Sequence, residues 1–291
     1  MPTRAGVAVV HFGDPAPTRA CLAALAADPS PVERTVVVVD NSGDLLESTA
    51  GSAVVIHCPD NPGFGAGANL GIAALGDDAW DAFVVLNHDV QVCAGFLAAA
   101  CAAVAGSGVG AAGGPLYLDP ERAHLWYAGG QVCFVTGTVR QSRSPRAARR
   151  AHAVGFVPGA AMAIAPGAWR EVGGFDPSFF LYNEDVDLCL RLRRRGFRLR
   201  FEPGMAAIHY VGAATGSNRH SAFYLEHISR TRLRPFAPLA FRLYLAALHS
   251  GYVTVRAGWY AGHGAAGRDA ARGLLRGHLA ALAALAQGPL R

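Results

Sequence analysis

The chain has 291 residues, of which 52% are hydrophobic and only 16% are charged, and its formal net charge is +5. That length is enough for one sizeable hydrophobic core with a smaller appended element. Every basic residue is arginine, and no arginine cluster is interleaved with aromatics or placed on a recognisable reading helix. We therefore exclude a nucleic-acid partner and expect anionic phosphates or a membrane surface to match the positive charge.

Six cysteines without CxxC spacing lie in apolar runs, which is typical of small buried side chains in a reducing compartment. No signal-peptide pattern precedes the first strand-like run. The uncharged stretch 90–118 is broken by glycines and Pro115 into a short helix and a strand, so we predict no transmembrane segment. We expect a cytoplasmic protein, with the inner face of the membrane as the alternative location.

The first hundred residues alternate short apolar runs with helical patterns. We predict strands at Val7 to Phe12, Thr35 to Val39, Val54 to His57 and Phe83 to Leu86, and a helix at Thr18 to Ala27. Runs that are apolar at every position suit strands buried on both faces, and their alternation with helices predicts a mainly parallel α/β sheet.

Polar residues follow these strands at their carboxyl ends, where ligands bind in open α/β sheets. His11 and Phe12 follow the first strand, and Asp40 and Asn41 follow the second. The Asp40 carboxylate suits a bond to a ribose or a base edge, but it suits an Asx-turn that ends the strand equally well. This segment alone leaves both roles open.

Asp89 follows the fourth strand in the group Asn87-His88-Asp89. One carboxylate at a strand end fits a sparse Mg²⁺ or Mn²⁺ site that is completed by substrate phosphates. The competing interpretation is an N-cap for a helix over 93–105.

The segment from Asn61 to Asn69 is glycine-rich and is predicted to begin a helix, as in a phosphate cradle. It is not a Walker loop, because no Lys-Ser/Thr follows, and it does not match a dinucleotide fingerprint. Close backbone packing explains glycines such as Gly65 equally well. Further on, residues 115–139 are predicted as strands with turns, and the Arg-rich segment 137–152 as a mobile surface loop whose part 140–150 forms a lid over donor or acceptor.

Residues 173–196 contain the sharpest signal. Asn183 is a plausible N-cap, acidic residues including Glu184 and Asp185 fill the first helical turn, arginines fill the last turn, and Gly196 ends the helix. Capping explains the charges but not the aromatic approach through Tyr182. A carboxylate held there suits a general base toward a hydroxyl, an effect of about 10²–10⁴ in rate.

Beyond this helix, His209 ends a strand-like run and would act as a ligand only if it meets Asp89 in space. Residues 219–291 place Arg and apolar residues at helical spacing. We expect a helical appendage that is either an interfacial amphipathic element or a surface packed on the catalytic domain or a second subunit, which includes a homodimer.

In this order, the segments resemble the inverting glycosyltransferases of family 2, and most closely the rhamnosyltransferase-like members. The resemblance covers residues 6–215, and more loosely residues up to 275. It rests on Val39-Asp40-Asn41-Ser42, Asn61-Pro62-Gly63-Phe64-Gly65 with Asn69 and Gly71, Leu86-Asn87-His88-Asp89-Val90, Gly173-Gly174-Phe175-Asp176, Phe180-Leu181-Tyr182-Asn183-Glu184-Asp185-Val186-Asp187-Leu188, Arg191, Gly196 and His209. It implies a GT-A fold over 1–215, with a mainly parallel mixed sheet flanked by helices, and a C-terminal helical region over 216–291.

The resemblance also implies roles. The donor, a dTDP-, UDP- or GDP-linked sugar that could be rhamnose, would contact His11, Phe12, Asp40, Asn41, Gly65, Asn69 and Asp89. A divalent cation, Mn²⁺ or Mg²⁺, would be held by Asp89 and His209. Asp185 would deprotonate the hydroxyl of a glycan, lipid-linked or small-molecule acceptor, with Gly159, Tyr182 and Glu184 on the acceptor side. The product would belong to cell-surface polysaccharide or glycolipid synthesis.

This sequence departs from the family pattern at two places: His88 stands where many relatives have proline, and the segment after Asp40 is one residue short. Two other functions compete with sugar transfer. A nucleotidyltransferase usually needs a basic, glycine-rich loop near the first strand, and residues 11–18 contain none. A non-catalytic protein that binds carbohydrate or a membrane surface would use the acidic helix start only as a cap.

Overall fold

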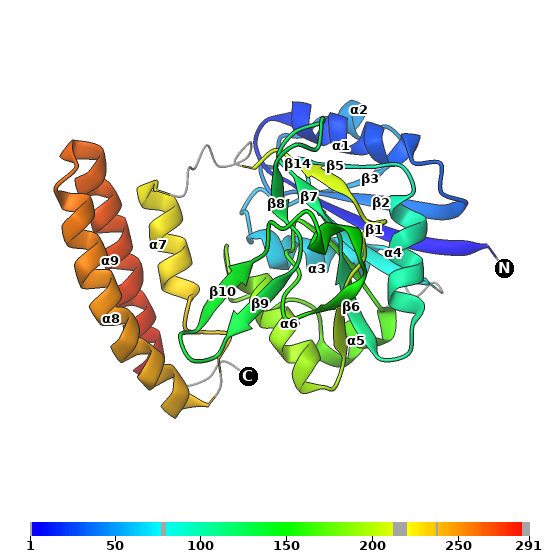
Figure 1. Cartoon of the computed structure of the whole chain (residues 1–291). Coiled ribbons are helices and arrows are strands. Elements are labelled where there is room, and N and C mark those ends of the chain that lie inside the picture. The colour runs from blue at the N-terminus through cyan, green and yellow to red at the C-terminus, as the bar shows by residue number, and fades with distance from the viewer. Residues whose placement is uncertain (1, 77–79, 212–219, 237, 287–291) are drawn as a thin grey trace.

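The computed structural model describes residues 2–76, 80–211, 220–236 and 238–286 (Figure 1). Its centre is an eight-stranded sheet in the order β11-β13-β6-β12-β4-β1-β2-β3. The strands are β1 (Thr3–His11), β2 (Val32–Asp40), β3 (Val54–His57), β4 (Ala82–Asn87), β6 (Val109–Gly113), β11 (His152–Val154), β12 (Ala161–Ile164) and β13 (Arg198–Phe201). The four strands predicted in the first hundred residues are confirmed as β1 to β4, and they run parallel to one another.

Apolar residues at successive positions explain why these strands lie in the middle of the molecule. Val37, Val38 and Val39 of β2 and Val84 and Val85 of β4 are almost completely buried. The strand β12 runs antiparallel between β4 and β6, so the sheet is mixed and mainly parallel, as predicted. The helices α1 (Pro15–Ala27), α2 (Glu47–Ala50), α3 (Phe64–Ala74), α4 (Phe96–Ala105), α5 (Pro166–Val172) and α6 (Glu184–Arg194) flank it (Figure 1).

A second, four-stranded sheet in the order β5-β14-β7-β8 lies beside the first. It consists of β5 (Val90–Val92), β7 (Leu116–Tyr117), β8 (Leu125–Tyr127) and β14 (Ala207–His209), and a separate hairpin joins β9 (Gly130–Cys133) to β10 (Thr138–Gln141). The register pairs His209 with Val90, and the Tyr210 N–H donates to the Asp89 carbonyl. This sheet therefore brings a distant segment of the chain to the carboxyl end of β4.

Three C-terminal helices stand together beside the sheets (Figure 1): α7 (Ala222–Thr231), α8 (Leu239–Ala261) and α9 (Gly264–Ala286). Both α7 and α8 pack on α9. The helical appendage is confirmed for the described residues, while the proposed boundary between 215 and 216 lies outside them. Within the described ranges, no helix combines the length and the apolar character needed to span a membrane.

The interpretation of Asp89 as the N-cap of a helix over 93–105 is wrong. The helix α4 begins at Phe96 after Gly95, and the side chain of Asp28 caps this end of the helix instead. The Asp28 Oδ1 accepts from the Gly95 N–H at 2.9 Å, and its Oδ2 accepts from the Leu97 N–H at 2.8 Å. Asp89 sits in the turn between β4 and β5, so its side chain is free of the capping role.

Parts of the segment 137–152 pair with neighbouring strands, unlike a simple surface loop. It includes β10, which pairs with β9, and it continues through a short 3₁₀ turn at Ala147–Arg149 to the first residue of β11. The ladder bonds of this hairpin fix the direction of the chain at Gln141, just before the arginines.

Candidate active site

A cleft of about 830 Å³ opens at the carboxyl ends of β1, β2 and β4 and extends to α6 and α7. This volume is typical of small-molecule sites, and the place is the one where open α/β sheets bind ligands. Eight of the twelve predicted site residues line it: Phe12, Asn41, Asp89, Gly159, Tyr182, Glu184, Asp185 and His209. The remaining four, His11, Asp40, Gly65 and Asn69, lie behind its wall.

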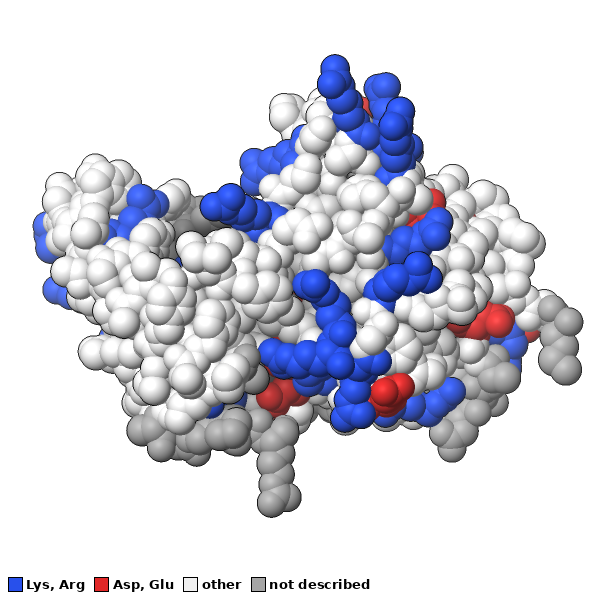
Figure 2. Space-filling view, turned by 60° about the horizontal axis from the view of Figure 1, so that its bottom comes forward, with Lys and Arg blue, Asp and Glu red and all other residues white. Residues whose placement is uncertain are grey.

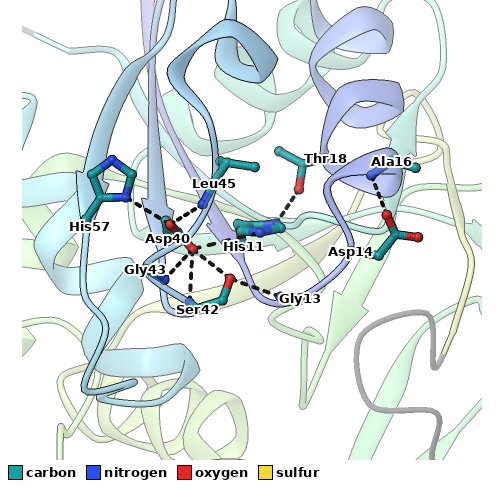
Figure 3. Close-up of polar contacts among 10 residues, drawn as sticks. All are labelled: His11, Gly13, Asp14, Ala16, Thr18, Asp40, Ser42, Gly43, Leu45 and His57. Carbon is teal, nitrogen blue, oxygen red and sulfur yellow. Dashed lines mark hydrogen bonds and ion pairs between the residues drawn. The ribbon is translucent and has the colours of Figure 1, made fainter.

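The side chain of Asp40 holds the turn that follows β2 (Figure 3). Its carboxylate is fully buried and accepts from the Ser42 N–H and hydroxyl and the Gly43 N–H on Oδ1, and from the Leu45 N–H and His57 Nδ1 on Oδ2. Burial by itself would raise the pKa of Asp40, but these hydrogen bonds outweigh it and lower the pKa to about 2. Asp40 is therefore an ionised turn residue, and its contact with a donor stays a prediction.

His11 is also fully buried, and its ring lies between Asp40 and Thr18 (Figure 3). Its Nδ1 lies 2.6 Å from the Thr18 hydroxyl, and its ring meets the ring of His88 edge to face at 5.3 Å. Burial first, and then His88, lower the pKa of His11. The ring is therefore neutral at pH 7. It packs against His88, which lines the cleft.

Gly65 and Asn69 pack α3 against Phe175, in the segment that precedes α6. The Asn69 side chain donates to the Phe175 carbonyl at 2.8 Å and accepts from the Phe175 N–H at 2.9 Å. A Cβ on Gly65 would lie 2.9 Å from the Phe175 Cβ, closer than real side chains come. Of the two interpretations of the glycine-rich segment, phosphate cradle or close backbone packing, these contacts with Phe175 favour close packing. Direct donor contact by Gly65 and Asn69 has no support from the geometry.

Asp89 and His209 meet in the cleft as the family resemblance implied. The Asp89 Oδ1 lies 3.3 Å from the His209 Nε2, and both side chains are buried. The contact lacks hydrogen-bond geometry, so the Asp89 Oδ1 has no hydrogen-bond partner among the described residues. A buried carboxylate oxygen and an imidazole nitrogen that face each other in this way suit two ligands of one divalent cation.

A second group, His11 with Asp40 and Asp44, also places one ligand-type atom of each residue within 4.8 Å of the others. Its chemistry fits a cation less well, because the Asp40 oxygens already accept five hydrogen bonds. We therefore assign the better fit to Asp89 and His209.

Glu184 and Asp185 begin α6 at the cleft wall. The Asp185 carboxylate accepts from the Gly159 N–H at 3.0 Å on Oδ2 and from the Val186 N–H at 2.8 Å on Oδ1, which fixes its orientation. Burial raises the pKa of Asp185 to about 6, against the opposing effect of these hydrogen bonds. Burial and then the charge of Asp185 raise the pKa of Glu184 to about 8. Both raised pKa values favour a proton on the pair near neutral pH, and the hydrogen bonds from Gly159 and Val186 favour the ionised form of Asp185.

The approach to α6 has an unusual backbone. Tyr182 and Asn183 both have positive φ, at 66° and 67°, in a region that non-glycine residues occupy at a cost of about 1–2 kcal/mol each. Asn183 occupies the predicted N-cap position without a side-chain cap bond. Its amide instead donates to the Ile228 carbonyl and the Thr231 hydroxyl of α7. These bonds attach the appendage to the loop that carries Asp185.

Sequence reasoning missed several residues that line the cleft. Trp126 of β8 meets the His209 ring edge to face at 5.1 Å, and Phe223, Tyr224 and Ile228 of α7 form part of the wall. Arg143 is the one Arg or Lys side chain among the described residues of the lining. Its place in the Arg-rich segment was the single available signal, and the lid over donor or acceptor stays a prediction.

With this geometry in view, known proteins were compared with the chain. Residues 2–234 match the family described as "Glycosyltransferase like family 2". An N-acetylglucosaminyl-diphospho-decaprenol L-rhamnosyltransferase of Mycobacterium tuberculosis is 28% identical over 214 residues, which are 66% of this chain and 66% of that protein. The alignment thus spans slightly less than two thirds of the relative's length.

Two solved structures share the fold. The GalNAc-T7 structure with UDP, GalNAc and Mn²⁺ superposes with a TM-score of 0.57 at 13% identity, covering 79% of this chain and 48% of that one. The mannosyltransferase PcManGT from Pyrobaculum calidifontis, in complex with GDP-Man and Mn²⁺, gives a TM-score of 0.54 at 16% identity, covering 100% of this chain and 79% of that one.

The sheet and its flanking helices are those of the GT-A fold. More particularly, the chain belongs to glycosyltransferase family 2 and is similar to its rhamnosyltransferase-like members.

Proposed function

We propose that this protein transfers a sugar, with rhamnose as our first choice, from a nucleoside diphosphate to an acceptor hydroxyl with inversion at the anomeric carbon. One observation carries the proposal: an oriented, ionised carboxylate, Asp185, shares a cleft with the Asp89–His209 pair. Inversion needs one base on the side of the sugar opposite the leaving group. The rhamnose assignment follows the name of the relative in Mycobacterium tuberculosis.

Each of the main residues of the cleft has its own role in the proposed reaction. Asp185 accepts the proton of the attacking hydroxyl, and its raised pKa makes it a better base at neutral pH than an ordinary aspartate. Glu184, kept protonated beside it, removes a second negative charge from the position where the acceptor approaches. Arg143 places a guanidinium at the cleft, where it suits the diphosphate of the donor.

Asp89 and His209 would hold the divalent cation, Mn²⁺ or Mg²⁺. The cation, when bound, neutralises charge on the leaving diphosphate. The fit rests on the two buried ligand-type atoms 3.3 Å apart and on the unsatisfied Asp89 oxygen. The donor would be dTDP-, UDP- or GDP-linked.

A lipid-linked acceptor at the inner face of the membrane suits the surface of the appendage. Exposed apolar side chains follow one face of α8, including Leu248, Tyr252, Val255 and Trp259. In Figure 2 the lobe formed by the C-terminal helices is mostly uncharged, and arginines gather over the neighbouring part of the molecule with few carboxylates among them. Apolar contact flanked by cations suits an anionic membrane, so we propose a cytoplasmic protein that touches this surface.

A thermal-shift panel of nucleoside diphosphates and their sugars, with and without Mn²⁺, tests the donor site. Ligand at 100 times its dissociation constant stabilises a fold by about 2.7 kcal/mol. We expect one nucleotide to raise the melting temperature of the wild type and of an Asp119→Ala control in a Mn²⁺-dependent way, and to fail with Asp89→Ala. Asp119 is a suitable control because it bonds only within its own turn. Absence of any nucleotide shift in folded protein would favour the non-catalytic binding protein instead.

A further inference from the structure

A second cavity, of about 410 Å³, lies within the C-terminal helices. The helix α7 separates it from the active-site cleft, because Tyr224 and Ile228 line both. Arg232 and Arg256 line the second cavity together with three histidines, and the described lining includes no carboxylate.

Among the described residues, neither of the two arginines forms an ion pair with a carboxylate. Between residues 220 and 286 the sequence has only two carboxylates, Glu226 and Asp269, and each lies by an arginine of α9 outside the cavity. Arg232 instead lies over the ring of Tyr252, with its guanidinium carbon 5.7 Å from the ring centre, and Arg256 packs on α8 aromatics. Burial lowers the pKa of Arg232, the direction expected for a cation held out of water.

Burial first, and then the charge of Arg232, lower the pKa of two histidines in the lining, His249 and His278, so these rings are neutral. His249 and His278 are 5% and 7% exposed. The His249 Nε2 lies 2.8 Å from the Thr136 carbonyl, and the His278 Nε2 lies 2.9 Å from the Ser250 hydroxyl, which itself donates to a backbone carbonyl. Both Nε2 atoms therefore carry the proton and donate within the protein, so the positive charge of the cavity comes from the two arginines.

We propose that this cavity is an anion site that takes a phosphate or diphosphate group. Two guanidinium groups without carboxylates form the fork-like donor set that phosphate oxygens prefer. The cavity is concave and large enough for such a group, and its positive charge has no acidic counterpart among the described lining residues. An anion there lies on the far side of α7 from the catalytic cleft and leaves the donor site free.

Isothermal titration calorimetry with inorganic diphosphate tests the site. EDTA in the buffer removes metal-dependent binding in the catalytic cleft. We expect binding by the wild type, by an Arg268→Gln control on the exposed surface of α9, and by Asp89→Ala. We expect the Arg232→Gln/Arg256→Gln variant to bind about tenfold or more weakly, because each charged hydrogen bond contributes about 1.5–3 kcal/mol. The proposal would be overturned if the double variant binds diphosphate as tightly as the wild type. It would also be overturned if Asp89→Ala loses diphosphate binding while the double variant keeps it.

Folding of the variants is followed by thermal unfolding. If the double variant does not fold, Arg256→Gln alone carries the test, because Arg256 is only half-buried. The source of the anion is resolved with vesicles that contain or lack undecaprenyl diphosphate. Arginine-dependent binding to the first vesicles alone identifies a lipid diphosphate, and calorimetric binding without vesicle binding identifies a free phosphate compound. Failure of this site leaves the donor-site experiment with Asp89→Ala unaffected.

Discussion

At the scale of single residues, the chemistry depends on how α6 divides one proton between two neighbouring carboxyl groups. Asp185 faces the Gly159 N–H, while the Glu184 Oε2 is buried with no hydrogen-bond partner among the described residues. An unpartnered buried carboxylate oxygen is costly when ionised, so the proton belongs on Glu184. This difference supports Asp185, and not Glu184, as the proposed base.

Replacing Asp185 by asparagine keeps the shape of the side chain and removes the base. We expect the transfer rate to fall by about 10²–10⁴ with the melting temperature nearly retained. Glu184→Gln is the matched control, since an amide resembles the protonated acid, and its rate should stay within about tenfold of the wild type. The measurement is single-turnover transfer with purified donor. An Asp185→Asn rate equal to that of the wild type would remove the general-base role.

The same pair predicts a dependence of stability on pH. The pKa of Glu184 is raised on folding from 4.5 to about 8, so the folded state binds this proton more tightly than the unfolded chain. This contribution is fully present below pH 4.5 and is lost as the pH rises through 8. Glu184→Gln should therefore be less pH-sensitive than the wild type, with a relative gain in unfolding free energy between pH 5 and pH 9. Denaturant titrations at these two pH values measure the gain, and parallel curves for both proteins would refute the pKa assignment.

At the scale of elements, Asp28 connects the end of α1 to the beginning of α4. It accepts from the N–H of Gly95, the N-cap residue of α4, and from the Leu97 N–H within α4, and it is 4% exposed; Asp14 at the start of α1 accepts, among the described residues, one hydrogen bond, from the exposed Ala16 N–H. Loss of a cap costs about 0.5–2 kcal/mol, with buried caps at the upper end. Asp28→Ala should therefore lower the unfolding free energy by about 2 kcal/mol, and Asp14→Ala by less than half of that. Equal losses in urea titrations would show that Asp28 does not act as a cap for α4.

The β9–β10 hairpin positions Arg143 over the cleft. We expect Arg143→Gln to raise the KM for the nucleotide sugar about tenfold with a smaller change in kcat, because a charged hydrogen bond to phosphate is lost. Arg146→Gln, in the same exposed segment but outside the cleft lining, should leave both constants unchanged. If both variants behave alike, the effect comes from the general charge of the segment and not from a specific contact.

These elements also show how far the sequence could be interpreted. The strands β1 to β4 were predictable because their residues are apolar at nearly every position, and the acidic start of α6 was visible as charges within a helical pattern. The meeting of Asp89 with His209 was not predictable from the residues alone, because it depends on β14 pairing with β5 across more than a hundred residues. For the same reason, the capping of α4 by Asp28 and the contribution of α7 to the cleft had no local signal.

At the scale of the whole molecule, the C-terminal helices link the catalytic cleft to an apolar outer surface. Asn183 ties α7 to the loop before α6, and α7 in turn packs on α9. On the outside of the bundle, Leu248, Val255 and Trp259 of α8 are 43%, 76% and 50% exposed. Apolar side chains repeated along one helix face in this way need a partner, and the proposed acceptor makes a lipid surface the partner that suits the reaction.

Two glutamates on this face provide the test. Leu248→Glu/Val255→Glu should reduce flotation with vesicles of anionic lipid several-fold, because each change places a charge in the contact. Leu46→Glu is the matched control: Leu46 is 70% exposed but lies before α2, far from α8 in the sequence. Size-exclusion chromatography of the same proteins examines the competing occupant. If the double variant floats like the wild type but changes from dimer to monomer, then α8 binds a second copy of the chain, and the acceptor must reach Asp185 without the bundle resting on a membrane.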